Sequence, residues 1–303
     1  MSGITGTVFP FQLVAGLVLL FSSFAASAAG QELTAVERGA YIFQAAGGCS
    51  CHTDVKNDGP FMAGGRPIAT PFGIIYSTNI TPDPETGIGG WSDEDFVRAM
   101  TQGVGPSGEQ YFPVFPYTSF TRMSLRDVLD LKAYLFSIDP VAQVNRQHEL
   151  RAPFGWRIGV RAWKLLFFQA GPMQPDRDRS AQWNRGAYLS RALGHCEECH
   201  TPRNLFGGLR KDMGHAGAVD GPDGELAPNI TPERDTGIGS WSPADLVWFL
   251  QMGLKPDGDD TQGLMSELIE TGYSHLGQDD LEAIATYILS LPPIHNKVEP
   301  REQ

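Results

Sequence analysis

Apolar residues recur at helical spacing in two segments of the chain, and each segment is followed by proline. The apolar positions are Val128, Leu131, Leu135 and Ile138 in the first segment, and Leu281, Ile284, Ile288 and Leu291 in the second. Spacings of three and four residues predict an amphipathic helix in each segment. Pro140 and the pair Pro292–Pro293 are expected to end these helices.

Helix-start signals precede three further segments of the chain. Thr34 and Glu37 form a capping-box pair at the start of a predicted helix over 34–46, whose counterpart is predicted over 183–193. Similar starts are Ser92 with Asp95, and Ser242 with Asp245, where Pro243 takes the first helical position. No strand pattern is strong, so the chain is predicted to be mainly α-helical.

Several sequence runs occur twice along the chain, in the same order. The run RGAY begins at Arg38 and again at Arg185, and NITPDPETGIGGWSDEDFV at Asn79 matches NITPERDTGIGSWSPADLV at Asn229. A repeat this extended predicts two copies of one domain, over 29–141 and 181–295, with a linker over 142–180 and a tail over 296–303. The repeated Asn-Ile-Thr matches a glycosylation acceptor, but its place in the repeat favours a structural turn.

Composition and charge limit the class of protein. The chain has 303 residues, of which 41% are hydrophobic, which is enough for two modest domains. A net charge of -12 argues against nucleic acid as a partner and favours a partner with a basic docking face. Segment 1–28 has no charged side chain, contains LVAGLVLLF and ends at Ala26-Ser27-Ala28. This pattern predicts a signal peptide and export, although no basic residue precedes the apolar run, so an uncleaved anchor stays an alternative.

Two cysteine motifs carry the candidate chemistry. CEECH, from Cys196 to His200, is a c-type haem attachment motif: two thiols form thioethers with the haem vinyl groups, and the histidine binds iron. CSCH, from Cys49 to His52, lies the same 11 residues after its RGAY arginine and is one residue shorter. We predict two haem c groups, with Cys49, Cys51, Cys196 and Cys199 as attachment residues. The alternative is a zinc or redox site.

The shortened loop leaves the number of thioethers at the first motif open. The missing residue is expected between the two cysteines, where a tighter loop would strain one bond and leave Cys51 as the sole attachment residue. A different placement of the gap would put Gly48 at the first cysteine position, again with one thioether.

The chain resembles dihaem class I c-type cytochromes, in particular the cytochrome subunits of bacterial membrane-bound alcohol, gluconate and related dehydrogenases. The resemblance covers nearly all of the chain after segment 1–28, and CSCH departs from the usual first motif. It is carried by the haem motifs and by the runs STNITPDPETGIGGWSDEDF, FPY, RSAQWNRGAYL and HTPRN. It implies two tandem class I cytochrome c domains that transfer electrons in the periplasm, from a dehydrogenase subunit to an oxidase or another cytochrome.

The resemblance also implies a methionine sulfur as the distal iron ligand, with His52 and His200 as the proximal ones. In the first copy we predict Met123, within SFTRMS before the closing helix. In the second copy Leu276 aligns with Met123, so Met265 in QGLMSEL is predicted, with His275 as the rival.

Four further residues are candidates for contact with haem propionates. Trp91 and Trp241 follow the two TGIG turns, and Arg66 and Arg210 follow glycine pairs in each half. A core tryptophan and a solvated surface arginine are the competing interpretations.

The linker run RAPFGWRIGVRAWKLLFFQAGPMQP is basic and aromatic within an acidic chain. It is expected either to dock on a dehydrogenase or at a membrane surface, or to pack the two domains together.

A competing function is a catalytic dihaem enzyme, peroxidase-like or thiosulfate-oxidising. It would need an open or unusual distal site, and all four cysteines already lie in the motifs.

Overall fold

The computed structural model describes residues 1–3, 6 and 32–300. Apart from residues 1–3 and 6, the predicted signal peptide lies outside the described residues. The chain from Leu33 onward forms one compact unit that contains both copies of the repeat. Across the described part of the chain, every helix is too short or too polar to cross a bilayer.

Helices make up most of the regular structure, as predicted. They are α1 (Ala35–Ala45), α2 (Asp93–Gln102), α3 (Tyr117–Phe120), α4 (Leu125–Leu135), α5 (Arg157–Phe167), α6 (Ala181–Tyr188), α7 (Cys196–His200), α8 (Pro243–Met252), α9 (Gly263–Thr271) and α10 (Gln278–Ile288). Shorter turns of helix are η1 (Gly47–His52), η2 (Val55–Asn57), η3 (Leu189–Leu193), η4 (Lys211–Met213), η5 (Pro222–Gly224) and η6 (Tyr273–His275).

A small antiparallel sheet was not predicted. Its strands are β1 (Pro67–Thr70), β2 (Gly73–Tyr76) and β3 (Glu149–Leu150), in that order. The first two strands have four residues each and the third has two, which is too short for an alternating pattern to show in the sequence.

The predicted capping boxes form as expected. Thr34, Ser92 and Ser242 each accept a hydrogen bond from the backbone N–H three residues on. The acidic side chain at that position accepts one from the backbone N–H of the capping residue. The counterpart of α1 differs from its prediction. It begins at Ala181 because Ser180 caps it, and its last turn, η3, is a π-helix.

In each copy the first helix crosses the closing helix at a glycine. Helix α1 packs on α4 and α6 packs on α10. A Cβ atom at Gly39 would lie 1.9 Å from the Asp130 carbonyl oxygen, and one at Gly186 would lie 1.8 Å from that of Ala283. The glycine of each RGAY run therefore permits the close approach of the two helices.

The Asn-Ile-Thr segments are structural turns, as predicted. Asn79 and Asn229 are both buried, and each accepts a 2.7 Å hydrogen bond from the threonine hydroxyl two residues on. Asn79 Nδ2 donates to the Val141 carbonyl at 2.7 Å, and Asn229 Nδ2 donates to that of Ile294 at 2.8 Å. Each asparagine thus ties its turn to the segment after the closing helix.

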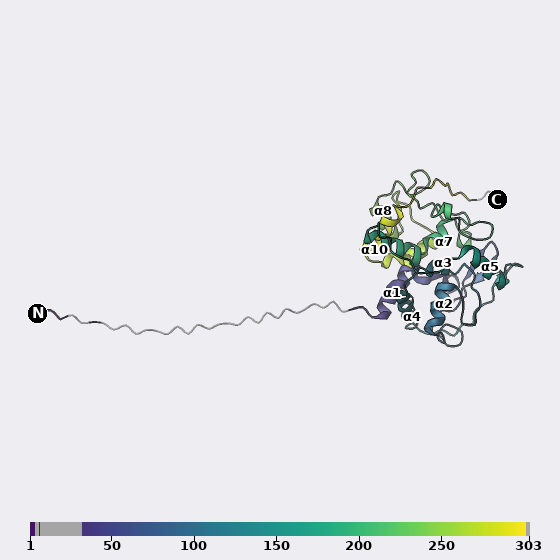
Figure 1. Cartoon of the computed structure of the whole chain (residues 1–303), viewed down its shortest axis with the longest axis horizontal. Coiled ribbons are helices and arrows are strands. Elements are labelled where there is room, and N and C mark those ends of the chain that lie inside the picture. The colour runs from purple at the N-terminus through teal and green to yellow at the C-terminus, as the bar shows by residue number, and fades with distance from the viewer. Residues whose placement is uncertain (4–5, 7–31, 301–303) are drawn as a thin grey trace. The chain divides into compact units, whose positions relative to one another are not determined.

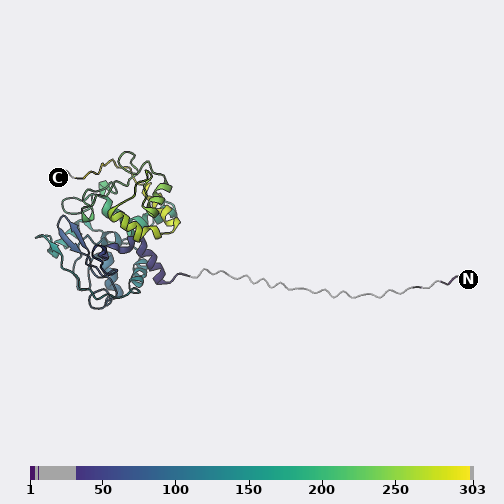
Figure 2. The ribbon, with the colours of Figure 1, turned by 180° about the vertical axis from the view of Figure 1, so that it is seen from behind.

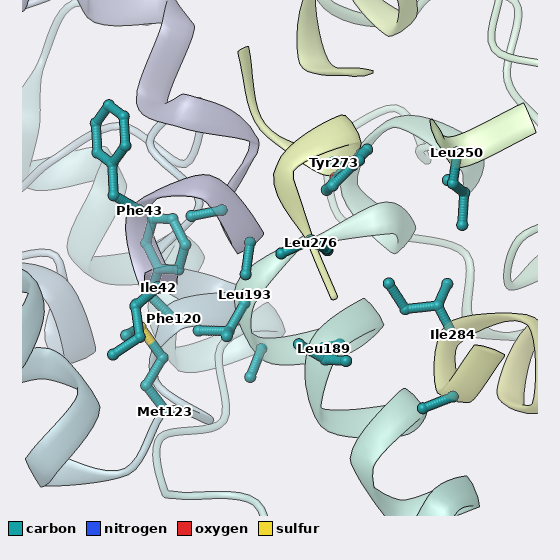
Figure 3. Packing of buried hydrophobic residues seen from close by; sticks show 14 of the residues in the cluster. Ile42, Phe43, Phe120, Met123, Leu189, Leu193, Leu250, Tyr273, Leu276 and Ile284 are labelled. Atoms are coloured by element: carbon teal, nitrogen blue, oxygen red, sulfur yellow. The ribbon is translucent and has the colours of Figure 1, made fainter. Parts of the chain in front are cut away.

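The two copies pack against each other through equivalent contacts. Tyr41 of the first copy donates its hydroxyl proton to Asp280 of the second at 2.7 Å, and Tyr188 of the second donates to Asp127 of the first. Figures 1 and 2 show α1, α2 and α4 grouped together and α8 and α10 on the other side, with α3 and α7 between them in Figure 1. One apolar cluster runs through both copies (Figure 3).

The linker contains helix α5, whose inner side packs on both copies. Lys164 Nζ donates to the Gln102 and Gly103 carbonyls of the first copy at 2.7 and 2.9 Å. Trp163 Nε1 donates to the Phe206 carbonyl of the second copy at 2.9 Å. This side of the linker therefore packs the two copies together, which was one of the two interpretations of its sequence.

Candidate functional site

The histidines of the two motifs have the same surroundings. His52 Nδ1 lies 2.7 Å from the Thr78 carbonyl oxygen, and His200 Nδ1 lies 2.8 Å from that of Pro228. A carbonyl oxygen only accepts, so Nδ1 carries the proton and donates it. This leaves the Nε2 lone pair of each imidazole as the atom that can bind a metal, with the ring orientation fixed by the backbone.

Burial favours the neutral form of both imidazoles. It lowers the pKa of His52 and of His200, although the hydrogen bonds to the carbonyls act in the opposite direction. A neutral imidazole is the form that binds iron. The donor set at each motif therefore fits a haem.

The four cysteine side chains are half-buried thiols, and none forms a disulfide. Burial raises the pKa of Cys49, Cys196 and Cys199 to about 12, and it also raises the pKa of Cys51. Among the described residues, three potential ligand atoms converge only at Glu233, Asp235 and His295, away from both motifs. Half-buried, protonated thiols with one histidine per motif suit haem attachment better than zinc.

The one-residue difference between the copies is taken up in the helix before the cysteines rather than between them. Ala46 N donates to the Ile42 carbonyl, four residues back, whereas Gly194 N donates to the Leu189 carbonyl, five residues back. The π-turn of the second copy thus takes up one residue, which places Gly48 at the backbone position of Cys196. This agrees with the second gap placement rather than with the expected one.

The backbone nevertheless brings the Cys49 side chain back toward its counterpart's surroundings. Cys49 has a left-handed conformation, with φ 46°, which is strained for a residue with a Cβ atom. Burial raises the pKa of Tyr134 and raises that of Tyr287 to about 12, and the nearby Cys49 and Cys196 add to the two shifts, so each sulfur lies near the equivalent tyrosine of its copy. Attachment through both thiols of the first motif stays a prediction.

The three candidate distal ligands have different surroundings. Met123 is 2% exposed in the apolar core, where Figure 3 shows it on the side of Ile42 and Phe120. Met265 lies on α9, half-buried against the core. His275 is exposed, and its Nδ1 lies 3.1 Å from the Ser274 hydroxyl. These placements favour Met265 over His275 in the second copy.

The predicted propionate contacts occupy unlike environments. Trp91 and Trp241 are both half-buried against the core. Arg66 is buried and pairs with Glu267 of the other copy, while Arg210 is exposed and pairs with Asp212 at 2.7 Å. The interpretation of a solvated surface arginine therefore fits Arg210 and does not fit Arg66, whose contact with a propionate stays a prediction.

Each motif is covered by the segment that precedes the closing helix of the other copy. Helix α9 packs on η1, where Thr271 Oγ1 donates to the Gly47 carbonyl at 3.1 Å. In the other direction, Ser119 Oγ donates to Glu198 at 3.2 Å, and the Thr118 hydroxyl donates to the same carboxylate. Sequence analysis missed these contacts, because nothing in a repeat shows whether its copies pack on themselves or on each other.

His215 is a further residue that sequence analysis missed. It is buried, its Nε2 makes no hydrogen bond, and burial lowers its pKa to about 4. It occupies the place of Met62: each backbone nitrogen bonds the threonine hydroxyl after the motif histidine at 3.0 Å, and each carbonyl accepts from an isoleucine. The spacing gave no signal, because Met62 lies 10 residues after His52 and His215 lies 15 residues after His200; the only signal was the Ala-Gly pair that follows each residue.

The chain matches no family model. It is 39% identical over 262 residues to a protein named diheme cytochrome c-type from Cereibacter sphaeroides, covering 85% of this chain and 86% of that protein. It is 43% identical over 259 residues to a nicotinate dehydrogenase subunit of Pseudomonas putida, covering 84% of this chain but only 21% of that protein. It is also 39% identical over 287 residues to the gluconate 2-dehydrogenase cytochrome c subunit of Pantoea cypripedii, covering 92% of this chain and 64% of the relative.

Proposed function

Because this chain belongs to the dihaem c-type cytochromes, we propose that it carries electrons from a dehydrogenase subunit, through two haem c groups, to an oxidase or another cytochrome. The dehydrogenase as donor is supported by the names of the relatives, which include cytochrome subunits of gluconate, fructose and alcohol dehydrogenases. The same names disfavour the catalytic dihaem enzyme.

We assign one haem to each of two tandem class I cytochrome c domains, over 29–141 and 181–295. His52 would bind the first haem iron and His200 the second, with Met265 as the distal ligand in the second domain. The cysteines of each motif would form the thioethers. The observation that carries the assignment is the equivalent hydrogen bond from each motif histidine to a backbone carbonyl.

Haem iron supplies one-electron oxidation and reduction. The chain itself would bind the haems, orient the imidazoles that face them and shield the attachment motifs. The Thr78 and Pro228 carbonyls hold each imidazole in one orientation, and burial keeps it neutral. The reciprocal covering of η1 by α9, and of α7 by residues of α3, holds the two copies together at both attachment motifs. Electron transfer between the domains then needs no motion of one against the other.

The intact mass of the purified protein under denaturing conditions tests this proposal, because thioether-bound haem survives the treatment. We expect the mass of two haems added to a chain that lacks residues 1–28, recovered from the periplasmic fraction. A mass with one haem would refute attachment at CSCH, and a mass without haem would refute the function. Reduction of the haems by the substrate of a co-purifying dehydrogenase tests the donor.

The outer face of α5 supports association with an anionic membrane surface. Leu165 and Leu166 are 88% and 75% exposed, Ile158 is also exposed, and Arg161 lies on the same face at helical spacing. Exposed apolar side chains next to arginine match the pattern of an interfacial helix, and this basic stretch contrasts with the net charge of -12 of the whole chain.

Sedimentation with vesicles tests this surface. We expect binding to vesicles that contain phosphatidylglycerol and loss of binding in the double variant Leu165→Ser, Leu166→Ser. Leu125→Ser is the matched control, because Leu125 is also exposed but lies on α4. Equal sedimentation of the parent protein with and without vesicles would refute membrane association.

A further inference from the structure

The segments that carry the distal ligands can be compared residue by residue between the two copies. Helices α2 and α8 both end at a left-handed glycine, Gly103 and Gly253. Each glycine carbonyl accepts a 2.8 Å hydrogen bond eight residues on, from Tyr111 N in the first copy and from Thr261 N in the second. The chain between them forms the same isolated bridge, Val104 with Gln110 and Leu254 with Asp260. The two copies are thus in register at an offset of 150 up to these residues.

The same offset places Phe115 at the position of Met265. The closing helices are related by an offset of 153 instead, because Ser124 N donates to the Tyr188 hydroxyl and Gly277 N donates to that of Tyr41. Counting back from those contacts places Phe112 at the position of Met265. With either count, the first copy has a phenylalanine where the second has the methionine.

Met123 occupies a core position rather than the position of Met265. Its backbone nitrogen donates to the Phe120 carbonyl at 3.0 Å, and Leu276 N donates to the Tyr273 carbonyl at 3.0 Å in the other copy. Both side chains are buried, with exposed fractions of 2% and 5%. A leucine fills this position in the second copy, so the packing there calls for an apolar side chain and not for a ligand.

The side chains around Phe115 are aromatic, and they include the buried Tyr117, whose ring centroid lies 6.4 Å away and whose pKa is raised by burial. Its ring lies 5.9 Å from that of Tyr111 and 5.7 Å from that of Phe120, between ring centroids. Burial raises the pKa of Tyr111, so its phenol stays protonated and does not act as an anionic ligand. Phenylalanine rings and protonated phenols would not complete an iron coordination sphere here.

We propose that the haem of the first copy lacks a protein ligand on its distal side and binds a small uncharged or anionic ligand there, such as carbon monoxide or cyanide. The haem of the second copy, with His200 and Met265, would be closed to such ligands. Distal polarity and access decide whether a haem binds ligands or only transfers electrons. The inference rests on the proposed function, since it requires a haem at each motif.

Titration of the reduced, full-length dihaem protein with carbon monoxide tests the proposal. We expect a spectral change for about half of the haem, measured against total haem from the pyridine haemochrome. The oxidised protein should show a methionine-to-iron charge-transfer band of about half the strength expected for two such haems. Met265→Leu should remove that band. The control Met123→Leu, which introduces the residue of the second copy, should leave both the band and the carbon monoxide titration unchanged.

Two results would overturn the proposal. One is an absence of carbon monoxide binding by a protein shown to hold two haems. The other is loss of half of the charge-transfer band in Met123→Leu, which would make Met123 the ligand. Phe115→Met provides a gain-of-ligand check and should lower the carbon monoxide binding while strengthening the band. A haem content below two would count against the proposed function and not against this inference.

Discussion

The crossing of α1 and α4 at Gly39 predicts how much an added Cβ atom at this position would lower the free energy of unfolding. A Cβ atom at this position would lie 1.9 Å from the Asp130 carbonyl oxygen and 2.8 Å from Tyr134 Cβ, where ordinary contacts begin at 3.4 Å. The helices would have to separate by about 1.5 Å against a backbone atom that cannot rotate away. Overpacking of this kind costs about 1–3 kcal/mol, and the better helix propensity of alanine offsets at most about 1 kcal/mol. We therefore expect Gly39→Ala to lower the free energy of unfolding by about 2 kcal/mol.

Urea denaturation followed by far-ultraviolet circular dichroism measures this change, with the slope of the transition as a check on the unfolding mechanism. The chain offers a matched control in Gly159, a glycine within α5 whose added Cβ atom would meet nothing within 4 Å. Gly159→Ala should stabilise the protein by about 0.4–1 kcal/mol. If Gly39→Ala were as stable as Gly159→Ala, close helix approach would not be the reason for the glycine in RGAY.

Three more substitutions test contacts described above by the same denaturation assay. Tyr41→Phe should cost about 2 kcal/mol, because it removes the hydroxyl that donates to Asp280 in the other copy; an unchanged midpoint would contradict this. His215→Met introduces the methionine that the first copy has at the equivalent position, Met62. The lowered pKa of His215, about 4, gives stability that is present above pH 6.5 and is lost as the pH falls toward 4, by up to about 3 kcal/mol. The variant should lack this part of the acid destabilisation, and retention of the full pH slope would assign it to other groups. Asn229→Ala should cost at least about 2 kcal/mol, since buried partners lose their hydrogen bonds; a loss below about 0.5 kcal/mol would show that water replaces them.

Much of the local structure follows from short-range signals in the sequence. The capping pairs at Thr34, Ser92 and Ser242 involve residues three positions apart, so the start of each helix is visible before any tertiary contact is known. The Asn-Ile-Thr turns are another such case. The attachment motifs are also local, because haem attachment needs both thiols and the histidine within one helical turn.

The features that the sequence did not reveal depend on contacts between distant segments. Helix α5 was not predicted, because its apolar residues lie on both its inner and its outer side and so blur the helical period. The carboxylate partners of Arg66, Tyr41 and Tyr188 lie in the opposite copy, and a repeat gives no direction for such pairings. The π-turn η3 contains one more residue than the equivalent turn of α1, and this shifts the register of the second motif. A sequence alignment places the same difference as a gap between the cysteines.

The reciprocal covering of the motifs has a consequence for biogenesis. Thr271 lies on the backbone of Gly47, and the hydroxyls of Thr118 and Ser119 bind Glu198, so each attachment loop is covered only when the other copy has packed on it. The thiols are half-buried in the contact between the two copies, and a thioether can form only while haem and thiol can reach each other. Both haems must therefore be attached to a chain whose two halves are still apart. A chain whose halves docked before attachment would remain without haem. The order of attachment and docking therefore decides the yield of haem-containing protein.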